Sequence, residues 1–115
     1  MNNNNLIGNL TKDPHFIAGN KEGKSSVAFL TVANNDDNEA VYIDVTVFGK
    51  TAEFANKHLK KGHRVAIEGK LAQRLKMVNS QEVKELYVIC KRLTNLNHNK
   101  AAGEDQKWAK EKLIN

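Results

Sequence analysis

Hydrophobic and polar side chains alternate along several stretches of the chain, most strictly over residues 41–50. The aliphatic side chains of this stretch fall at every second position, namely Ile43, Val45 and Val47. A period of two over this length is typical of a β-strand with one face toward a core. The opposite face would then carry the aromatic rings of Tyr42 and Phe48 among polar residues.

Aromatic rings exposed on a sheet are surfaces on which nucleobases stack. The alternative is that Tyr42 and Phe48 pack beneath a loop and have only a structural role. This strand alone does not decide between the two interpretations, so other parts of the sequence are needed to distinguish them.

Four other stretches have the composition and period of strands: residues 5–10, 27–33, 65–77 and 86–93. In the second of these, Phe29 falls on the face opposite to the aliphatic residues. Turn-forming residues at 34–38 and 78–82 are expected to connect neighbouring strands.

The stretch 65–77 has a further feature, a row of basic residues on one face. The aliphatic positions, which we expect to face the core, are Val65, Ile67, Leu71, Leu75 and Met77. The basic residues on the other face are Lys70, Arg74 and Lys76. Side chains two and four positions apart on a strand point the same way, so these three form a charged row.

Between residues 51 and 62 the period changes to that of a short helix. Thr51 is placed to cap its N-terminus, and Gly62 suits the position just after its C-terminus. A narrow apolar stripe, formed by Ala52, Ala55 and Leu59, is enough to close one end of a small barrel.

The order of these elements predicts an all-β fold. Three strands, one short helix and a two-stranded hairpin follow one another along the chain. This is the layout of the five-stranded Greek-key barrel called the OB fold, with its helix between strands 3 and 4. We expect residues 1–96 to form this domain, and residues 97–115 to be a C-terminal extension that is helical or disordered.

Charge is distributed unevenly along the 115 residues, whose formal net charge is +5. Residues 1–49 hold three lysines against six acidic residues, whereas residues 50–115 hold fifteen basic against seven acidic residues. Within 57–76 there are seven basic residues opposed only by Glu68. A basic zone of this kind favours a polyanion partner. A solvated lysine-rich surface and an acidic protein partner are the alternatives.

Several other classes of function find no support in the sequence. The longest apolar runs are too short to span a membrane, and the Asn-rich start is unlike a signal peptide. One cysteine, Cys90, allows no internal disulfide, so we expect a reducing cytoplasm. The four histidines have no metal-ligand spacing, and no phosphate loop or nucleophile motif occurs. We therefore expect a non-enzyme without metal or cofactor.

Four motifs in order resemble the bacterial and phage single-stranded-DNA-binding proteins. The matching segments are Leu6-Ile7-Gly8-Asn9-Leu10-Thr11-Lys12-Asp13-Pro14, Val27 to Ala33, Val47-Phe48-Gly49-Lys50-Thr51-Ala52-Glu53 with Leu59-Lys60-Lys61-Gly62, and Val65-Ala66-Ile67-Glu68-Gly69-Lys70-Leu71. The resemblance implies an OB-fold protein that coats single-stranded DNA with little sequence preference in replication, recombination and repair. It also implies a homo-oligomer, a tetramer or a dimer.

The resemblance further implies roles for individual residues. Tyr42 and Phe48 match stacking aromatics of the family, and Lys50 follows them as a phosphate contact. The full set that we expect to bind nucleic acid is Tyr42, Phe48, Lys50, Phe29, Lys70, Arg74, Lys76 and Lys12. Other stacking positions have no aromatic counterpart at 34–38 or at Lys76, and Asp44 should repel phosphate. Binding should therefore depend mainly on charge and weaken strongly with salt.

The C-terminal residues also depart from the family pattern. Cellular members end in an acidic tip that recruits partners, whereas residues 97–115 hold four lysines and three acidic residues. Any replication or recombination partners would then be recruited by other means, as in a compact protein of a phage or mobile element. The alternative function is an OB-fold adaptor in a replication or recombination complex whose DNA binding is weak.

Overall fold

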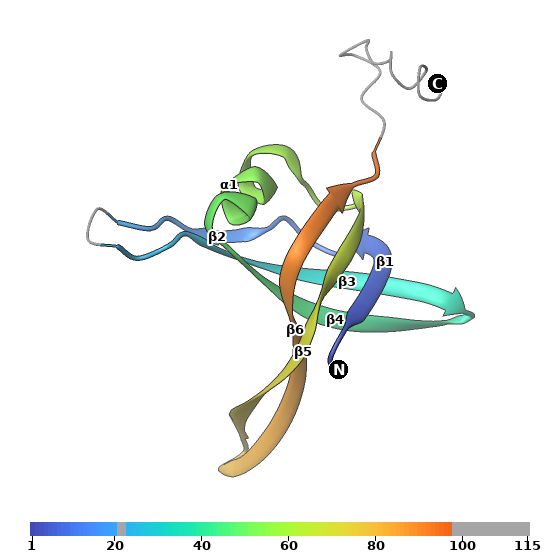
Figure 1. Cartoon of the computed structure of the whole chain (residues 1–115). Helices are drawn as coiled ribbons and strands as arrows, with labels where there is room; N and C mark the ends of the chain where they lie inside the picture. The colour runs from blue at the N-terminus through green and yellow to red at the C-terminus, as the bar shows by residue number, and fades with distance from the viewer. Residues whose placement is uncertain (21–22, 98–115) are drawn as a thin grey trace.

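The computed structural model describes residues 1–20 and 23–97, which form six strands and one helix (Figure 1). In chain order they are β1 (Asn4–Leu10), β2 (His15–Ile17), β3 (Val27–Asp37), β4 (Glu39–Phe48), α1 (Gly49–His58), β5 (Arg64–Val78) and β6 (Gln81–Asn95). The expected C-terminal extension lies outside the described residues, apart from Asn97. In the described ranges no helix has the length and apolar character needed to cross a bilayer.

Five of the strands close into a barrel in the order β1-β5-β6-β4-β3, and β1 also pairs with β3. β4 and β6 run parallel, whereas the other barrel pairs are antiparallel. The short β2 lies beside β3, and α1 follows the third strand of the barrel. The predicted OB fold is therefore confirmed, with β2 as an addition.

Close packing of β1 against its neighbours depends on a glycine. A Cβ atom on Gly8 would overlap the carbonyl oxygen of Ala33, which lies on β3. Leu10 pairs with Val32 at the same junction, so the strands that close the barrel approach one another here. Gly8 thus allows a contact between backbones that a side chain would prevent.

The core consists of the inward-facing residues that the alternation predicts. The largest fully buried side chains are Leu30, Ile67, Val32, Val45, Val47, Val65 and Val88. Helix α1 adds a buried stripe, as expected, which is formed by Ala52, Ala55 and Leu59. Burial of these apolar groups is the main stabilising term of such a barrel.

The helix boundaries differ from the prediction. Helix α1 begins at Gly49, directly after β4, with Phe48 at the N-cap position, so Thr51 is not the cap. Among residues 1–20 and 23–97 no side chain caps this N-terminus. Gly49 has a φ of 67°, a conformation that glycine adopts readily and that turns the strand straight into the helix. The C-cap is Leu59, and Gly62, with a φ of 90°, lies in the turn before β5.

Two strand pairs extend further than the turn-forming residues predict. β3 and β4 continue to the pair Asp37 and Glu39, so that only Asn38, with a φ of 74°, remains between them. β5 and β6 are joined by Asn79 and Ser80, whose φ values of 51° and 67° fit a two-residue hairpin turn.

The hairpin of β5 and β6 also corrects the expected core. Residues 71–86, which we call the β5–β6 arm, project beyond the barrel at the bottom of Figure 1. Leu75 and Met77 are 61% and 64% exposed, although they continue the inward-facing series of β5. They lie outside the core because β1 pairs with β5 only as far as Gly69.

Candidate nucleic-acid interface

The aromatic residues predicted on the outer face of β4 are exposed. Tyr42 is 66% exposed and Phe48 is 51% exposed. Between them Thr46 is buried, although it lies on the same face of the strand. The alternation therefore placed both rings correctly, and neither packs beneath a loop.

Strand register brings the aromatic and basic residues onto one surface. Phe29 pairs with Thr46, Thr46 pairs with Ile89, and Ile89 pairs with Lys70. Paired residues on neighbouring strands point to the same side of a sheet, so this row crosses β3, β4, β6 and β5 on the outside of the barrel. We call this surface the outer face.

Arg74 is held on the outer face by acidic residues. Its guanidinium lies 3.1 Å from the carboxylate of Asp44 on β4 and 3.4 Å from that of Glu85 on β6. It also lies 4.6 Å from the centre of the Tyr87 ring, within the range of a cation–π contact. Lys76 reaches the same Glu85 carboxylate at 4.0 Å. Much of the predicted basic row is thus already paired within the protein.

Asp44 was expected to repel phosphate, but its charge is balanced locally. One carboxylate oxygen accepts a hydrogen bond of 3.0 Å from the Thr31 hydroxyl, and the other accepts one of 3.1 Å from Arg74. Both the Arg74 and Asp44 side chains remain partly exposed, at 38% and 41%. Asp44 therefore organises the outer face and does not stand on it as an isolated charge.

A cavity of about 220 Å³ opens on the outer face beside this ion pair. The residues that line it are Lys12, Phe29, Leu30, Thr31, Asp44, Val45, Thr46 and Arg74. Three of them, Lys12, Phe29 and Arg74, belong to the set expected to bind nucleic acid. A ring, two cations, a carboxylate and two hydroxyls are thereby gathered around one space.

Two aromatic residues of the outer face were not identified from the sequence. His15 pairs with Phe29 across β2 and β3, and their rings stack with centres 6.0 Å apart. Tyr87 pairs with Ala72 on β5 and lies beneath Arg74. The position of Tyr87 next to the buried Val88 could have indicated that its ring points outward.

The basic zone at 57–76 does not form a single patch. Arg64 and Lys76 lie near opposite ends of β5, at most about 40 Å apart along the strand at about 3.3 Å per residue. Arg64 donates a hydrogen bond to Asn9 near the closure of the barrel. The lysines at 57, 60 and 61 lie at the end of α1 and in the turn after it. Only the residues from Lys70 onward face the candidate site.

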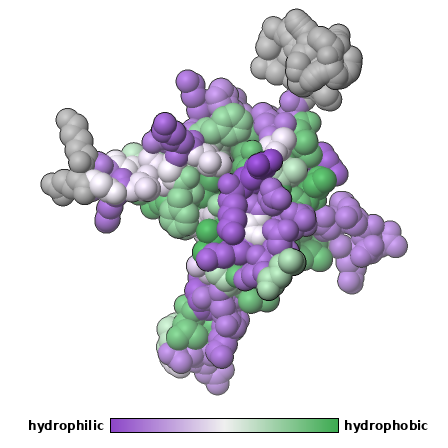
Figure 2. Space-filling view, in the orientation of Figure 1, coloured by the Kyte–Doolittle hydropathy of each residue, from purple (hydrophilic) through white to green (hydrophobic). Residues whose placement is uncertain are grey.

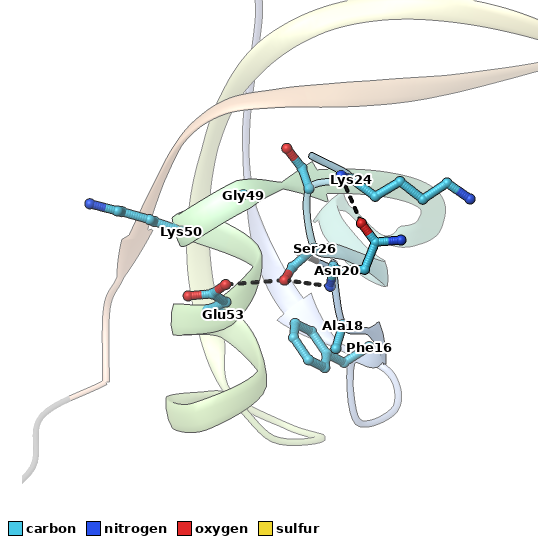
Figure 3. Close-up of a pocket in the computed structure, with 10 residues that line it drawn as sticks. Phe16, Ala18, Asn20, Lys24, Ser26, Gly49, Lys50 and Glu53 are labelled. Atoms are coloured by element: carbon cyan, nitrogen blue, oxygen red, sulfur yellow. Dashed lines mark hydrogen bonds between the residues drawn. The ribbon is translucent and has the colours of Figure 1, made fainter. Parts of the chain in front are cut away.

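Lys50 lies at the start of α1, next to the exposed ring of Phe48. A polar cavity of about 450 Å³ adjoins it, and Figure 3 shows the Lys50 side chain extending away from that space. In this cavity the Ser26 hydroxyl bonds to the Glu53 carboxylate at 3.1 Å and accepts the Gly19 amide at 3.0 Å. These hydrogen bonds of Ser26 join the chain before β3 to the helix, and Lys50 is directed toward solvent.

The described residues contain no group of three or more His, Cys, Asp or Glu side chains arranged to hold a metal ion. The acidic residues of the outer face bond instead to Arg74, Lys76 and Thr31. The outer face offers rings for stacking and charged groups for ion pairs and hydrogen bonds.

Comparison with known proteins gives matches that extend through the barrel. Residues 1–96 match the model of the Single-strand binding protein family. Single-stranded DNA-binding protein 1 of Clostridium acetobutylicum is 39% identical over 80 residues, which cover 64% of this chain and 73% of that protein.

Two further relatives are longer than the chain. The single-stranded DNA-binding protein of Malacoplasma penetrans is 34% identical over 114 residues, or 93% of this chain and 59% of that protein. That of Wolinella succinogenes is 38% identical over 73 residues, or 57% of this chain and 45% of that protein. The matched part thus spans less than two thirds of the length of these two relatives.

Proposed function

The chain belongs to the single-strand binding protein family, and we propose that it binds and coats single-stranded DNA with little dependence on sequence. The observation that supports this most directly is the row from Phe29 to Lys70 across four strands of the outer face. Bases can stack on rings at one side of this row while the phosphates meet cations at the other. A surface of this kind is typical of proteins that coat single strands.

Stacking is assigned to the most exposed rings of the outer face. Tyr42 and Phe48 lie on the same side of β4, six residues apart, which is about 20 Å along a strand. Phe29 and His15 form a second, smaller aromatic surface beside them. These positions suit successive bases of an extended strand.

Phosphate contacts are assigned to the cations that remain unpaired. Among the residues that the structure describes, Lys12, Lys50 and Lys70 have no carboxylate within salt-bridge distance. Arg74 and Lys76 can contribute only by sharing their charge with Asp44 and Glu85. The proposed phosphate path therefore depends more on the lysines than on Arg74.

The test is binding of a labelled oligothymidine and of a duplex of equal length across a salt series. We expect preference for the single strand at low salt, and a linear fall of log K with log salt concentration. Equal affinity for both forms at low salt would contradict the proposal. No step of this function requires catalysis, a metal or a cofactor, and its site of action would be the cytoplasm.

The alternative function is an adaptor in a replication or recombination complex. The observation in its favour is the exposed apolar surface of the β5–β6 arm, which DNA binding does not explain. The apolar residues on one face of the arm are Leu71, Leu75, Met77 and Leu86, at 42%, 61%, 64% and 62% exposure. Figure 2 shows hydrophobic side chains on one side of this arm, at the bottom of the view.

We propose that this apolar face contacts a second copy of the chain, as expected for a homo-oligomer. A two-stranded ribbon is only marginally stable in water, so a partner that covers the arm would stabilise it. Lys84 and Glu82 lie on the same face, where they pair with Leu75 and Met77. In a two-fold contact, Lys84 of one copy can therefore lie opposite Glu82 of the other copy. Whether the assembly is a dimer or a tetramer stays a prediction, as does an origin in a phage or mobile element.

A further inference from the structure

The cavity beside the Arg74–Asp44 pair has features that plain stacking does not require. The residues that line it include Phe29, which is 37% exposed, and Thr46, which is 6% exposed. Asp44 and Arg74 line the same space, so a hydrogen-bond acceptor and a donor stand side by side next to a ring. A group that stacks on Phe29 would therefore present its edge to a carboxylate and a guanidinium.

The Asp44 carboxylate retains the capacity to bind such a group. An ionised carboxylate has about four acceptor positions. In this structure one oxygen accepts from Thr31 at 3.0 Å, and the other accepts from Arg74 at 3.1 Å. Each oxygen thus keeps a second lone pair, and the side chain is 41% exposed. These two bonds hold the carboxylate in one orientation.

The volume of the cavity suits a single base. Its volume of about 220 Å³ is well above what a single water needs. A pyrimidine ring with its substituents fits a space of this size. Lys12, which also lines the cavity, is available to the phosphate that accompanies the base.

Nucleobases differ in what they offer to a carboxylate. Cytosine and adenine carry an exocyclic amino group, at N4 and N6, that donates hydrogen bonds, whereas thymine carries the acceptor O4 at the corresponding position. A carboxylate accepts from the amino group and is repelled by O4. The N3–H donor of thymine lies between O4 and O2, so a carboxylate that accepts from it also meets these two acceptor oxygens. Arg74 can in turn donate to the ring nitrogen acceptor next to the amino group.

We propose that this cavity is a base subsite that favours bases with an exocyclic amino group over thymine, and that Asp44 is the discriminating residue. The inference rests on the proposed binding of single-stranded DNA and adds a preference at one position of an otherwise tolerant surface. It also gives Asp44 a role in place of the simple repulsion of phosphate.

The test compares oligocytidine and oligothymidine of about 16 nucleotides, a length near the upper end of OB-fold sites. Both are pyrimidines, so differences in stacking are small. The full chain should bind oligocytidine roughly tenfold more tightly, as expected for one well-placed pair to a base edge. The readout is fluorescence anisotropy at one fixed, low salt concentration.

The decisive variant is Asp44→Asn, which keeps the size of the side chain but replaces one acceptor by a donor. Its affinity ratio for the two oligonucleotides should fall to about one, because the amide can also donate to O4 of thymine. Asp36→Asn is the matched control, since it removes the same charge from the exposed end of β3. This control should keep the ratio of the unmodified chain.

Two results would overturn the inference: equal binding of both oligonucleotides by the unmodified chain, or an unchanged ratio in Asp44→Asn. A duplex of equal length separates this failure from that of the proposed function. If both single strands bind better than the duplex but equally well, only the base preference is wrong. If neither binds better than the duplex, the proposed function itself fails.

Discussion

The guanidinium of Arg74 and the carboxylate of Asp44 lie 3.1 Å apart, and they connect β5 to β4 across the intervening β6. The same guanidinium lies over the ring of Tyr87. An arginine held in this way offers less charge to phosphate than its position on the outer face suggests. The lysines of the outer face should therefore determine the salt dependence of DNA binding.

This relationship predicts different salt slopes for two basic variants. Lys70→Ala should reduce the slope of log K against log salt by about 0.7, the value for one phosphate contact on a single strand. Arg74→Ala should reduce it by clearly less, because Asp44 and Glu85 already neutralise part of the guanidinium charge. Titrations of oligothymidine over a salt series measure both slopes.

Lys57→Ala is the matched control for these two variants, because Lys57 lies in the last turn of α1 and away from the outer face. Its slope should equal that of the unmodified chain. A loss of slope in Arg74→Ala as large as that in Lys70→Ala would show that the acidic partners do not restrain Arg74.

Tyr42→Ala and Phe48→Ala should each weaken the binding of oligothymidine by about 1–3 kcal/mol, the range for one base on one ring. Both side chains are more than half exposed, so their removal should leave the stability of the fold nearly unchanged. Phe54→Ala is the control, since this ring is 36% exposed on α1 and contacts His58. Anisotropy titrations and thermal melts separate the two effects, and unchanged affinity in both site variants would remove the stacking role.

Much of the barrel follows from the period of its strands. Alternation placed Val45 and Val47 in the core and Tyr42 and Phe48 outside, because the side chains of a strand alternate between its two faces. The prediction of core residues was less accurate where β5 extends beyond the barrel. Leu75 has the period of a core residue but lies on the arm, where it is 61% exposed.

The ion pairs of the outer face could not be predicted in the same way. Periodicity indicates which face a side chain joins, but not which residue of another strand lies next to it. Arg74 and Asp44 are 30 residues apart in sequence and meet because β5 and β4 pair with opposite edges of β6. The stack of His15 on Phe29 likewise depends on the short β2, which no sequence pattern indicated.

Gly8→Ala should destabilise the protein by about 1–3 kcal/mol, which is typical of overpacking at a tightly packed position. The added Cβ would overlap the carbonyl oxygen of Ala33 and force β1 away from β3. Ile7→Ala is the neighbouring control, because Ile7 is 46% exposed and its truncation leaves little cavity. Urea denaturation followed by circular dichroism gives both values, and a Gly8→Ala variant as stable as the unmodified chain would contradict the close approach.

Leu75→Lys and Leu86→Lys should shift the protein toward the monomer if the β5–β6 arm contacts a second copy. A charge in the centre of an apolar contact must be desolvated without a partner, which weakens association. Sedimentation equilibrium measures the shift. Gln73→Lys is the control, because Gln73 lies on the same face but is polar; it tests whether an added charge anywhere on this face weakens association. An unchanged association constant in both leucine variants would exclude the arm as the contact.

Cys90 should react slowly with alkylating reagents in the folded protein. Burial raises the pKa of its thiol from 9.0 to about 11, and the thiolate is the reactive form. Near pH 8 the thiolate fraction is then about a hundredfold smaller than in the unfolded chain. Mass spectrometry of iodoacetamide-treated protein, with and without urea, measures the ratio at the single cysteine of the chain.

The same raised pKa makes the contribution of Cys90 to stability depend on pH. The folded state favours the neutral thiol, so this contribution is fully present below pH 9 and is lost as the pH rises toward about 11. The difference in unfolding free energy between the unmodified chain and Cys90→Ala should therefore shrink over this range. Urea titrations of both proteins at several pH values measure it, and a constant difference from pH 9 to 11 would show that burial does not hold the thiol neutral.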